Sequence, residues 1–424
     1  MGLKIRLIIM NFLVFAVWGS YLTSMGSYLA SVGMGTNIGW FYSVQGIVSL
    51  FMPAIIGIIA DRWIPAQKML SICHFLAAIF MAGAGYMGMK YGENVTFAQL
   101  FPLYTLSVAF FMPTIALDNS VSYTALTAGG YDTVKAFPPI RVFGTIGFIC
   151  SMWIVDLLGF QHDYRQFFVC AIWGVILGIY ALTLPNCPVN KGKPSQSFVD
   201  TFGLRAFTLF KEKRMCLFFI FSMLLGVSLQ ITNGYANTFI SAFKDVKEYA
   251  DTFAVQHANI LISLSQISET LCILLIPFCL RKFGIKKVML IAMFAWVLRF
   301  GFFGVGNPGS GVWLFILSMI VYGVAFDFFN ISGSLFVDQE TSPEIRSSAQ
   351  GVFMMMTNGF GATIGTLAAQ GVVNKLVYSN SDVTAQISAW SSTWYIFAAY
   401  ALVVAVLFAI LFQYKHDPNK IKTN

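Results

Sequence analysis

The sequence predicts an all-α integral membrane protein with twelve transmembrane helices in two six-helix halves. Of its 424 residues, 57% are hydrophobic and 10% are charged, whereas soluble domains carry about 25% charged residues. The mean hydropathy is +0.73. A single long hydrophilic connection, residues 185–213, separates the apolar segments into two sets of six. The net charge of +8 does not indicate nucleic-acid binding, because the cations are spread over many short loops.

Twelve apolar segments approach or exceed the roughly 20 residues that a helix needs to cross a bilayer. Pro53, Pro113 and Pro277 lie inside segments and are expected to kink them. The first segment is too long for the apolar region of a signal peptide, so we expect it to remain as a helix. The segments span residues 5–31, 37–60, 67–90, 97–127, 137–160, 166–184, 214–243, 253–280, 285–305, 311–338, 343–375 and 389–414.

The Lys and Arg residues predict the orientation in the membrane. Nineteen of the 26 fall on the side that holds both termini, five fall on the opposite side, and two lie within segments. Because short loops rich in Lys and Arg stay in the cytoplasm, both termini are expected there. The expected organisation is a half over 1–184, a cytoplasmic linker over 185–213 and a half over 214–424. Within the linker, Phe198 to Phe210 is expected to form a short amphipathic helix on the membrane surface.

Two loops at corresponding positions of the halves carry similar motifs. The sequence GIIADR, ending at Arg62, resembles the start of the loop motif that follows the second helix in the major facilitator superfamily. The sequence RKFGIKK, residues 281–287, resembles the basic part of that motif. With the two six-helix halves and the basic linker, these loops indicate the major facilitator fold.

The tenth segment, WLFILSMIVYGVAFDFFNISGSLF, carries an acid in its middle. An ionised carboxylate at mid-membrane costs roughly 2.5–3.5 kcal/mol even on a lenient insertion scale. Tyr322, Phe326 and Asn330 recur at four-residue spacing and share one helix face, with Asp327 at its edge. This face is expected to line the protein interior or a wet cavity. Two interpretations stay open for Asp327: substrate or proton handling, and a structural ion pair.

The fifth segment begins FPPIRVFGTIGF and places Arg141, Thr145 and Phe148 on one face. An interior arginine keeps its charge and therefore needs an anion or several hydrogen-bond acceptors. The alternative is that the Arg141 side chain reaches the cytoplasmic surface.

The seventh and eighth segments add amides and a second acid. Gln230, Asn233 and Asn237 form one stripe, and such amides either join neighbouring helices or bind a hydrogen-bonding solute. Gln266 and Glu269 share a face of the eighth segment. Glu269 is interpreted as a proton carrier or as one partner of a fixed salt bridge, to Arg141 or to Arg299.

Together, these residues suit a neutral solute that has a ring and hydroxyl groups. Aromatic side chains stack on flat rings, while amides and carboxylates bind hydroxyls and base edges. The sequence contains no HExxH, GxSxG or metal-spaced histidine cluster, which argues against an enzyme. The seven cysteines show no CxxC spacing, so neither a metal site nor a disulfide framework is indicated, and no cofactor is expected.

Several strings closely resemble the nucleoside:proton symporter family of the major facilitator superfamily. They are FPPIRVFGTIGF, FFIFSMLLGVSLQITN, SLSQISETL, LSMIVYGVAFDFFNISGS and RSSAQGVFMMMTNGFG. The opening NFLVFAVWGSYLTSMGSYL and the closing QYKH also resemble it, so the similarity runs essentially end to end. The resemblance implies proton-driven uptake of purine and pyrimidine nucleosides, such as uridine and adenosine, by alternating access across the bacterial inner membrane. It implies nucleosides, H+ and the lipid bilayer as partners, and we expect a monomer.

The resemblance also implies roles for individual residues. The nucleoside is expected in a central cavity between the halves, with its base near Phe148 and Phe326. Asp327 or Glu269 is expected to carry the proton. The substrate-binding set is expected to comprise Arg141, Thr145, Phe148, Gln230, Asn233, Gln266, Glu269, Tyr322, Phe326 and Asn330. Two alternatives remain: a proton-coupled sugar or oligosaccharide symporter, and a membrane sensor that binds without transporting.

Overall fold

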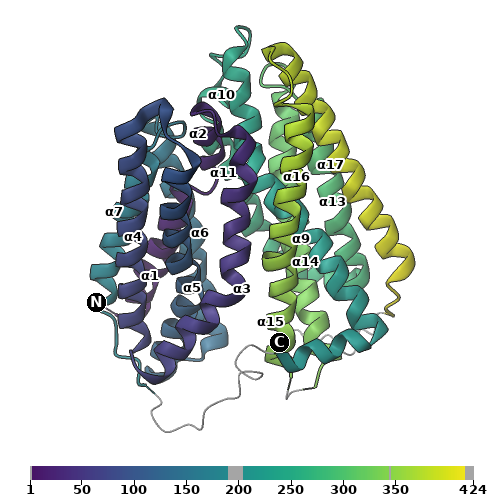
Figure 1. Ribbon diagram of the computed structural model, residues 1–424. Coiled ribbons are helices and arrows are strands. Elements are labelled where there is room, and N and C mark those ends of the chain that lie inside the picture. Colours follow the sequence, from purple (N-terminus) through teal and green to yellow (C-terminus); the bar gives the residue numbers. More distant parts are fainter. Residues whose placement is uncertain (1, 190–203, 343–344, 416–424) are drawn as a thin grey trace. The chain divides into compact units, whose positions relative to one another are not determined.

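The computed structural model describes residues 2–189, 204–342 and 345–415, and those residues form helices and connecting turns without any strand. The chain divides into two compact units, Met1–Gln196 and Ser197–Asn424, which are coloured purple to teal and teal to yellow in Figure 1. We refer to them as unit 1 and unit 2.

Unit 1 is built from seven described α-helices. They are α1 (Leu3–Gly19), α2 (Met25–Ser31), α3 (Ile38–Arg62), α4 (Ala66–Tyr91), α5 (Phe97–Ala128), α6 (Thr133–Leu157) and α7 (Arg165–Ala181). A capping box starts α5, in which the Thr96 backbone N–H donates to the Gln99 side chain at 3.0 Å. This arrangement satisfies N–H groups that have no partner within the helix itself.

Unit 2 is also built from helices, but more of its spans are interrupted. Its elements are η3 (Leu204–Lys211), α9 (Lys213–Ala242), η4 (Phe243–Asp245), α10 (Phe253–Gln256), α11 (Ala258–Ile273), α12 (Ile276–Phe283), α13 (Ile285–Val305), α14 (Val312–Glu340), α15 (Arg346–Met354), η5 (Met355–Gly361), α16 (Ala362–Leu376) and α17 (Val383–Leu411). Among these, η5 is a π-helical turn between α15 and α16, so these three elements form one interrupted span.

The predicted spans correspond to these elements with four differences, one of which is the π-helical interruption of the eleventh span. The first span breaks after Gly19 into α1 and α2. The eighth bends by 56° between α11 and α12, just before Pro277, whose nitrogen cannot donate a helical hydrogen bond. The last begins at Val383, six residues before the predicted start, because the Asp382 side chain accepts from the Ala385 N–H and caps the helix. Pro53 and Pro113 lie inside α3 and α5, which continue past them.

The two units repeat one packing pattern. In unit 1, α1 packs against α6 and α7, α4 packs against α5 and α7, and α3 packs against α5 (Figure 1). In unit 2, α9 packs against α16 and α17, α13 packs against α14 and α17, and α11 packs against α14. If the six spans of each unit are numbered in chain order, the same numbered pairs of spans pack together in both units. Such internal repeats are typical of transporters that work by alternating access.

The predicted surface helix of the linker is only partly confirmed. Residues 198–203 lie outside the described part of the chain. The remainder, η3, is a 3₁₀ helix that packs against α9 and α15. Its Leu209 side chain is buried, and the Phe210 ring lies 5.1 Å from the Phe219 ring. The described part of the segment therefore packs on unit 2.

Close helix packing in unit 2 depends on glycine. A Cβ at Gly226 of α9 would collide with the Thr357 backbone carbonyl, and a Cβ at Gly361 would collide with the Met223 carbonyl. Both glycines therefore allow α9 and the π-helical turn η5 to pack with their backbones in contact. Small residues let helix backbones approach this closely in membranes.

We expect Gly226→Ala to destabilise unit 2, because α9 would have to move away from Thr357. Overpacking of this kind costs about 1–3 kcal/mol. Thermal unfolding of the purified protein in detergent should shift to lower temperature. Gly301→Ala is the matched control, since a Cβ at Gly301 meets nothing within 4 Å. Equal unfolding temperatures for the two variants would contradict the packing role.

Candidate functional site

The centre of α14 combines an aromatic pair with a buried acid. The rings of Tyr322 and Phe326 are stacked, with centroids 5.9 Å apart and planes inclined by 10°. Asp327 follows directly and is 6% exposed. The predicted aromatic face of the tenth span is therefore present, and Asp327 lies inside the protein.

Arg299 of α13 packs against the Tyr322 ring of this pair. It is completely buried, and its guanidinium lies 4.6 Å from the centre of the Tyr322 ring. Its hydrogen bonds go to neutral oxygens: Thr232 Oγ1 at 3.3 Å, Ser265 Oγ at 3.4 Å and the Ser318 carbonyl at 2.6 Å. The interpretation in which Arg299 forms the salt bridge to Glu269 is therefore not supported. Arg299 holds the Tyr322 ring in place instead.

The second acid, Glu269, approaches Tyr322 from α11. Glu269 is half-buried and lies within electrostatic range of the Tyr322 hydroxyl, as does Asp327. The two helices meet closely because Gly323 fits against the Ser268 backbone and the Ser268 hydroxyl donates to the Ile320 carbonyl. The aromatic pair is thus flanked by two carboxyl groups from two helices.

The amides divide into two groups with different roles. Asn237 Nδ2 donates to Asn259 Oδ1 on α11 at 2.8 Å, and Asn237 Oδ1 accepts from Ser241. Asn237 therefore joins α9 to α11. Of the two interpretations that the sequence left open for Asn237, the structure supports the one in which it links neighbouring helices. Asn233 Nδ2, by contrast, donates to Gln230 Oε1 within α9 at 3.2 Å. On α11, the buried Gln266 Oε1 has no hydrogen-bond partner among the residues that the structure describes, which makes it available to a ligand.

Substitutions of these amides should separate the two roles. We expect Asn237→Ala to lower the thermal stability by about 0.6–2 kcal/mol, the range for hydrogen bonds between membrane helices, with little change in ligand affinity. Asn233→Ala should do the reverse. Unfolding curves and ligand titrations on both purified variants measure this, and an affinity loss in the Asn237 variant alone would contradict the assignment.

The polar stripe of α14 continues beyond Asn330, the last residue that the sequence singled out. Ser334 and Asp338 follow at four-residue spacing. Gln350 of α15 donates to the Ser334 carbonyl at 2.7 Å and accepts from the Ser334 hydroxyl at 3.1 Å. These residues border an open groove with an empty volume of about 920 Å³, lined by Asn330, Ile331, Ser334, Leu335, Asp338, Gln350, Phe353 and Met354. The periodicity that identified Asn330 would have found Ser334 as well.

The predicted residues of the fifth span lie on α6 in unit 1. The Arg141 guanidinium covers the Phe15 ring of α1 at 3.9 Å. Phe148 is 7% exposed and meets the Trp18 ring edge-on at 6.2 Å. Thr145 lies between them and is half-buried. Phe148 thus has an aromatic packing partner within its own unit, on α1.

Two buried acids of unit 1, Asp118 and Asp156, were missed. Asp118 of α5 is 1% exposed, and neither of its carboxylate oxygens has a hydrogen-bond partner among residues 2–189, 204–342 and 345–415. The signal was present in the sequence, because Asp118 falls inside the fourth apolar segment, where any ionisable residue is unusual.

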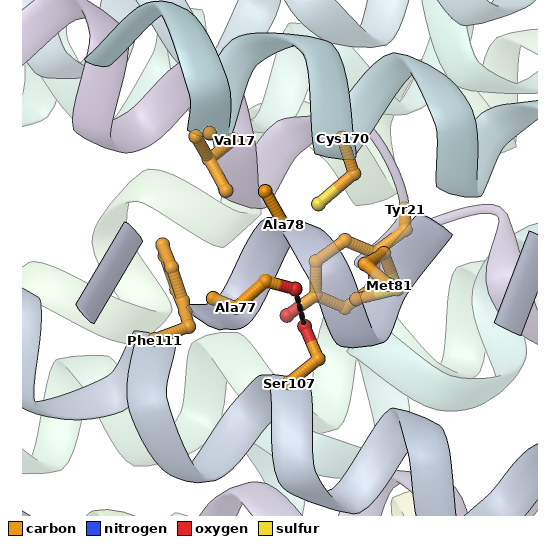
Figure 2. A pocket seen from close by; sticks show the side chains of 9 residues that line it. Val17, Tyr21, Ala77, Ala78, Met81, Ser107, Phe111 and Cys170 are labelled. Atoms are coloured by element: carbon orange, nitrogen blue, oxygen red, sulfur yellow. Dashed lines mark hydrogen bonds between the residues drawn. The ribbon is translucent and has the colours of Figure 1, made fainter. Parts of the chain in front are cut away.

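Unit 1 also contains a narrow space among α1, α4, α5 and α7 (Figure 2). Its empty volume is about 220 Å³, and its lining is mostly hydrocarbon, as the side chains of Val17, Met81 and Phe111 show. The Ser107 hydroxyl in its wall donates to the Ala77 carbonyl at 2.8 Å. This space offers little to a polar solute, so the candidate site is the aromatic, amide and acid cluster of unit 2.

Comparison with known proteins decides the family. A family model described as nucleoside H+ symporter matches residues 1–417. The chain belongs to the nucleoside H+ symporter family. Its function is therefore proton-coupled nucleoside transport, and it is a transporter and not an enzyme. The symporter is a multi-pass inner membrane protein.

Curated relatives of this symporter match it over nearly their whole length. It is 48% identical to the nucleoside permease NupG of Escherichia coli (strain K12), covering 98% of this chain and 97% of the relative. It is 47% identical to the xanthosine permease of the same organism, covering 100% and 99%.

Solved structures establish the fold of the symporter. The crystal structure of an aspartate-to-alanine mutant of nucleoside transporter NupG matches with a TM-score of 0.91 at 47% identity, covering 97% of this chain and 100% of that one. A bacterial homologue of the lysosomal transporter Spinster matches with a TM-score of 0.69 at 12% identity and shares the fold alone. The symporter has the major facilitator fold with twelve transmembrane helices, as predicted.

Proposed function

We propose that this symporter takes up purine and pyrimidine nucleosides, and that unit 2 supplies the main recognition surface. The relatives named for nucleosides and for xanthosine support this substrate range. The observation that carries the proposal is the stacked pair of Tyr322 and Phe326 with Glu269 and Asp327 beside it. A flat aromatic surface suits a nucleobase of any identity, because every base has a π-face.

The polar groups around the aromatic pair suit the rest of a nucleoside. Gln230, Asn233 and Gln266 offer amide donors and acceptors, and Glu269 offers carboxylate oxygens that accept from hydroxyls. We propose that these four residues bind the ribose and the base edges. Asn330 would act on the same stripe one turn beyond Phe326. Arg141, Thr145 and Phe148 of unit 1 remain proposed members of the substrate-binding set.

Of the two acids beside the aromatic pair, we propose Asp327 as the proton carrier. Asp327 is buried next to Phe326, whereas Glu269 is half-buried. A buried carboxyl changes the local charge most strongly when it gains or loses a proton, because nearby water cannot screen it. Proton binding at Asp327 would thus be linked directly to the occupancy of the aromatic pair.

We propose a cytoplasmic location for both termini and for the linker over 185–213, with halves over 1–184 and 214–424. The excess of Lys and Arg in the segments assigned to that side of the membrane supports this orientation. We also propose that the symporter works as a monomer and exposes its site to either side of the membrane by alternating access.

Substrate competition in proteoliposomes tests the proposed range. Uptake of labelled uridine driven by an inward proton gradient should be inhibited by excess adenosine and xanthosine, and unaffected by excess glucose or ribose. Inhibition by the free sugars instead would favour a sugar or oligosaccharide symporter. Tight uridine binding without any uptake, in protein shown to be folded, would favour a sensor.

A further inference from the structure

Asp118 is a buried acid in unit 1 to which the transport scheme gives no role. It lies inside the membrane-spanning helix α5 and is 1% exposed, and no residue in the described part of the chain hydrogen-bonds to either carboxylate oxygen. An ionised carboxylate in such a place lacks the hydrogen bonds that would offset its lost hydration. Structural acids in membrane proteins are normally paired or hydrogen-bonded, so the state of Asp118 needs another explanation.

The internal repeat relates Asp118 to Asp327. Helices α4 and α5 of unit 1 correspond to α13 and α14 of unit 2 in the packing pattern. In each pair, a serine of the later helix donates to a carbonyl of the earlier one: Ser107 to Ala77 at 2.8 Å, and Ser318 to Arg299 at 3.0 Å. Asp118 follows its serine by 11 residues, and Asp327 follows its serine by nine. At 1.5 Å per residue, both acids lie about 14–17 Å further along corresponding helices, so they occupy a similar depth, although at 3.6 residues per turn they point to opposite faces relative to their serines.

A single cation influences Asp118. Among the ionisable side chains described on α5 and on the helices packed against it, the one that acts on Asp118 is the Arg141 guanidinium of α6. That guanidinium also covers the Phe15 ring. His74 of α4 packs against Phe111 of α5, seven residues before Asp118. The remaining ionisable groups of these helices have contacts elsewhere or lie toward the helix ends; they are Lys4, Arg6, Arg62, Lys68, Lys90, Lys135 and Asp156.

We propose that Asp118 is a second proton-binding carboxyl of the transport cycle, located in unit 1 beside Arg141. It binds a proton on one oxygen when the carrier is loaded and releases that proton to water when the carrier returns empty. The positive charge of Arg141 then attracts the resulting carboxylate, so the electrostatic attraction between the two groups acts in only one of the two states. This role rests on the proton-coupled function and adds a site in the other unit of the repeat.

The test compares Asp118→Asn with wild type in proteoliposomes by two measurements. The first is uridine accumulation driven by an imposed proton gradient, and the second is exchange of internal for external uridine at equal pH. A permanently neutral Asn imitates the protonated state, so exchange should continue. The deprotonated return step should be lost, and accumulation should fall to the equilibrium level. Asp163→Asn is the control, because Asp163 forms an exposed ion pair with Arg165 at 2.8 Å, and such pairs contribute little.

Each outcome decides the matter. Full accumulation by Asp118→Asn, or loss of its exchange together with accumulation, would overturn the proposal, the latter by assigning Asp118 to binding or structure. If the Asn variant does not fold, Asp118→Glu serves: the proposal predicts gradient-driven accumulation with a shifted pH profile, and an unchanged profile would overturn it. Wild-type protein that fails to accumulate uridine would contradict the proposed function, not the role of Asp118 alone.

Discussion

Asp327→Asn is expected to abolish concentrative uptake of uridine while leaving exchange of uridine across the membrane. With an imposed gradient of about two pH units, one coupled proton supports about 100-fold accumulation, since each pH unit is worth about 1.4 kcal/mol. The variant should reach only equal concentrations inside and outside. The reason is that a neutral amide at this buried position cannot release a proton before the carrier returns.

The comparison with Glu269→Gln shows which acid couples. If Asp327 carries the proton and Glu269 binds substrate hydroxyls, the Glu269 variant should have weakened uridine affinity but should still accumulate at saturating uridine. Full accumulation by Asp327→Asn would exclude Asp327 as the coupling residue. Loss of accumulation in the Glu269 variant alone would transfer that role to Glu269.

Phe326→Ala is expected to raise the uridine concentration needed for half-maximal uptake roughly 5- to 150-fold. Stacking of a base on an aromatic side chain is worth about 1–3 kcal/mol, and each 1.4 kcal/mol is a factor of ten. The substitution also removes the ring stacked on Tyr322. Initial rates of labelled uridine uptake at several concentrations measure the effect.

Two controls accompany this variant. Phe326→Tyr keeps the aromatic surface and should retain most of the affinity. Phe294→Ala removes an aromatic ring that is 43% exposed on α13 and should leave uptake unchanged. An unaltered half-saturation concentration in Phe326→Ala would contradict stacking of the base on this helix.

The sequence predicted the helices well because hydrophobic length is a direct requirement of the bilayer. Its errors lie where local hydrogen bonding decides. The early start of α17 depends on the Asp382 cap. The break after α1 was missed because the pattern of apolar residues does not mark it. Pro277 predicted a kink near the bend between α11 and α12, but the angle of the bend depends on packing.

The site was predictable only in part, because residue type and spacing do not give partners. The stripe of Tyr322 and Phe326 followed from four-residue spacing and is present. The sequence could not show that Asn237 and Asn233 have different roles, because the role of Asn237 depends on its hydrogen bond to Asn259 of the neighbouring helix. Arg299 was suspected of pairing with an acid, yet three neutral oxygens and Tyr322 accommodate it.

The most direct test of proton coupling is the movement of protons when uridine is added without any imposed gradient. Proteoliposomes in weak buffer with a pH indicator outside, and potassium and valinomycin to compensate charge, report this movement. Symport predicts that the external medium becomes alkaline in a fixed ratio to the uridine taken up, and that Asp327→Asn removes the signal. Uridine entry with no change in external pH would contradict the account, because it would show a carrier whose acids do not couple transport to protons.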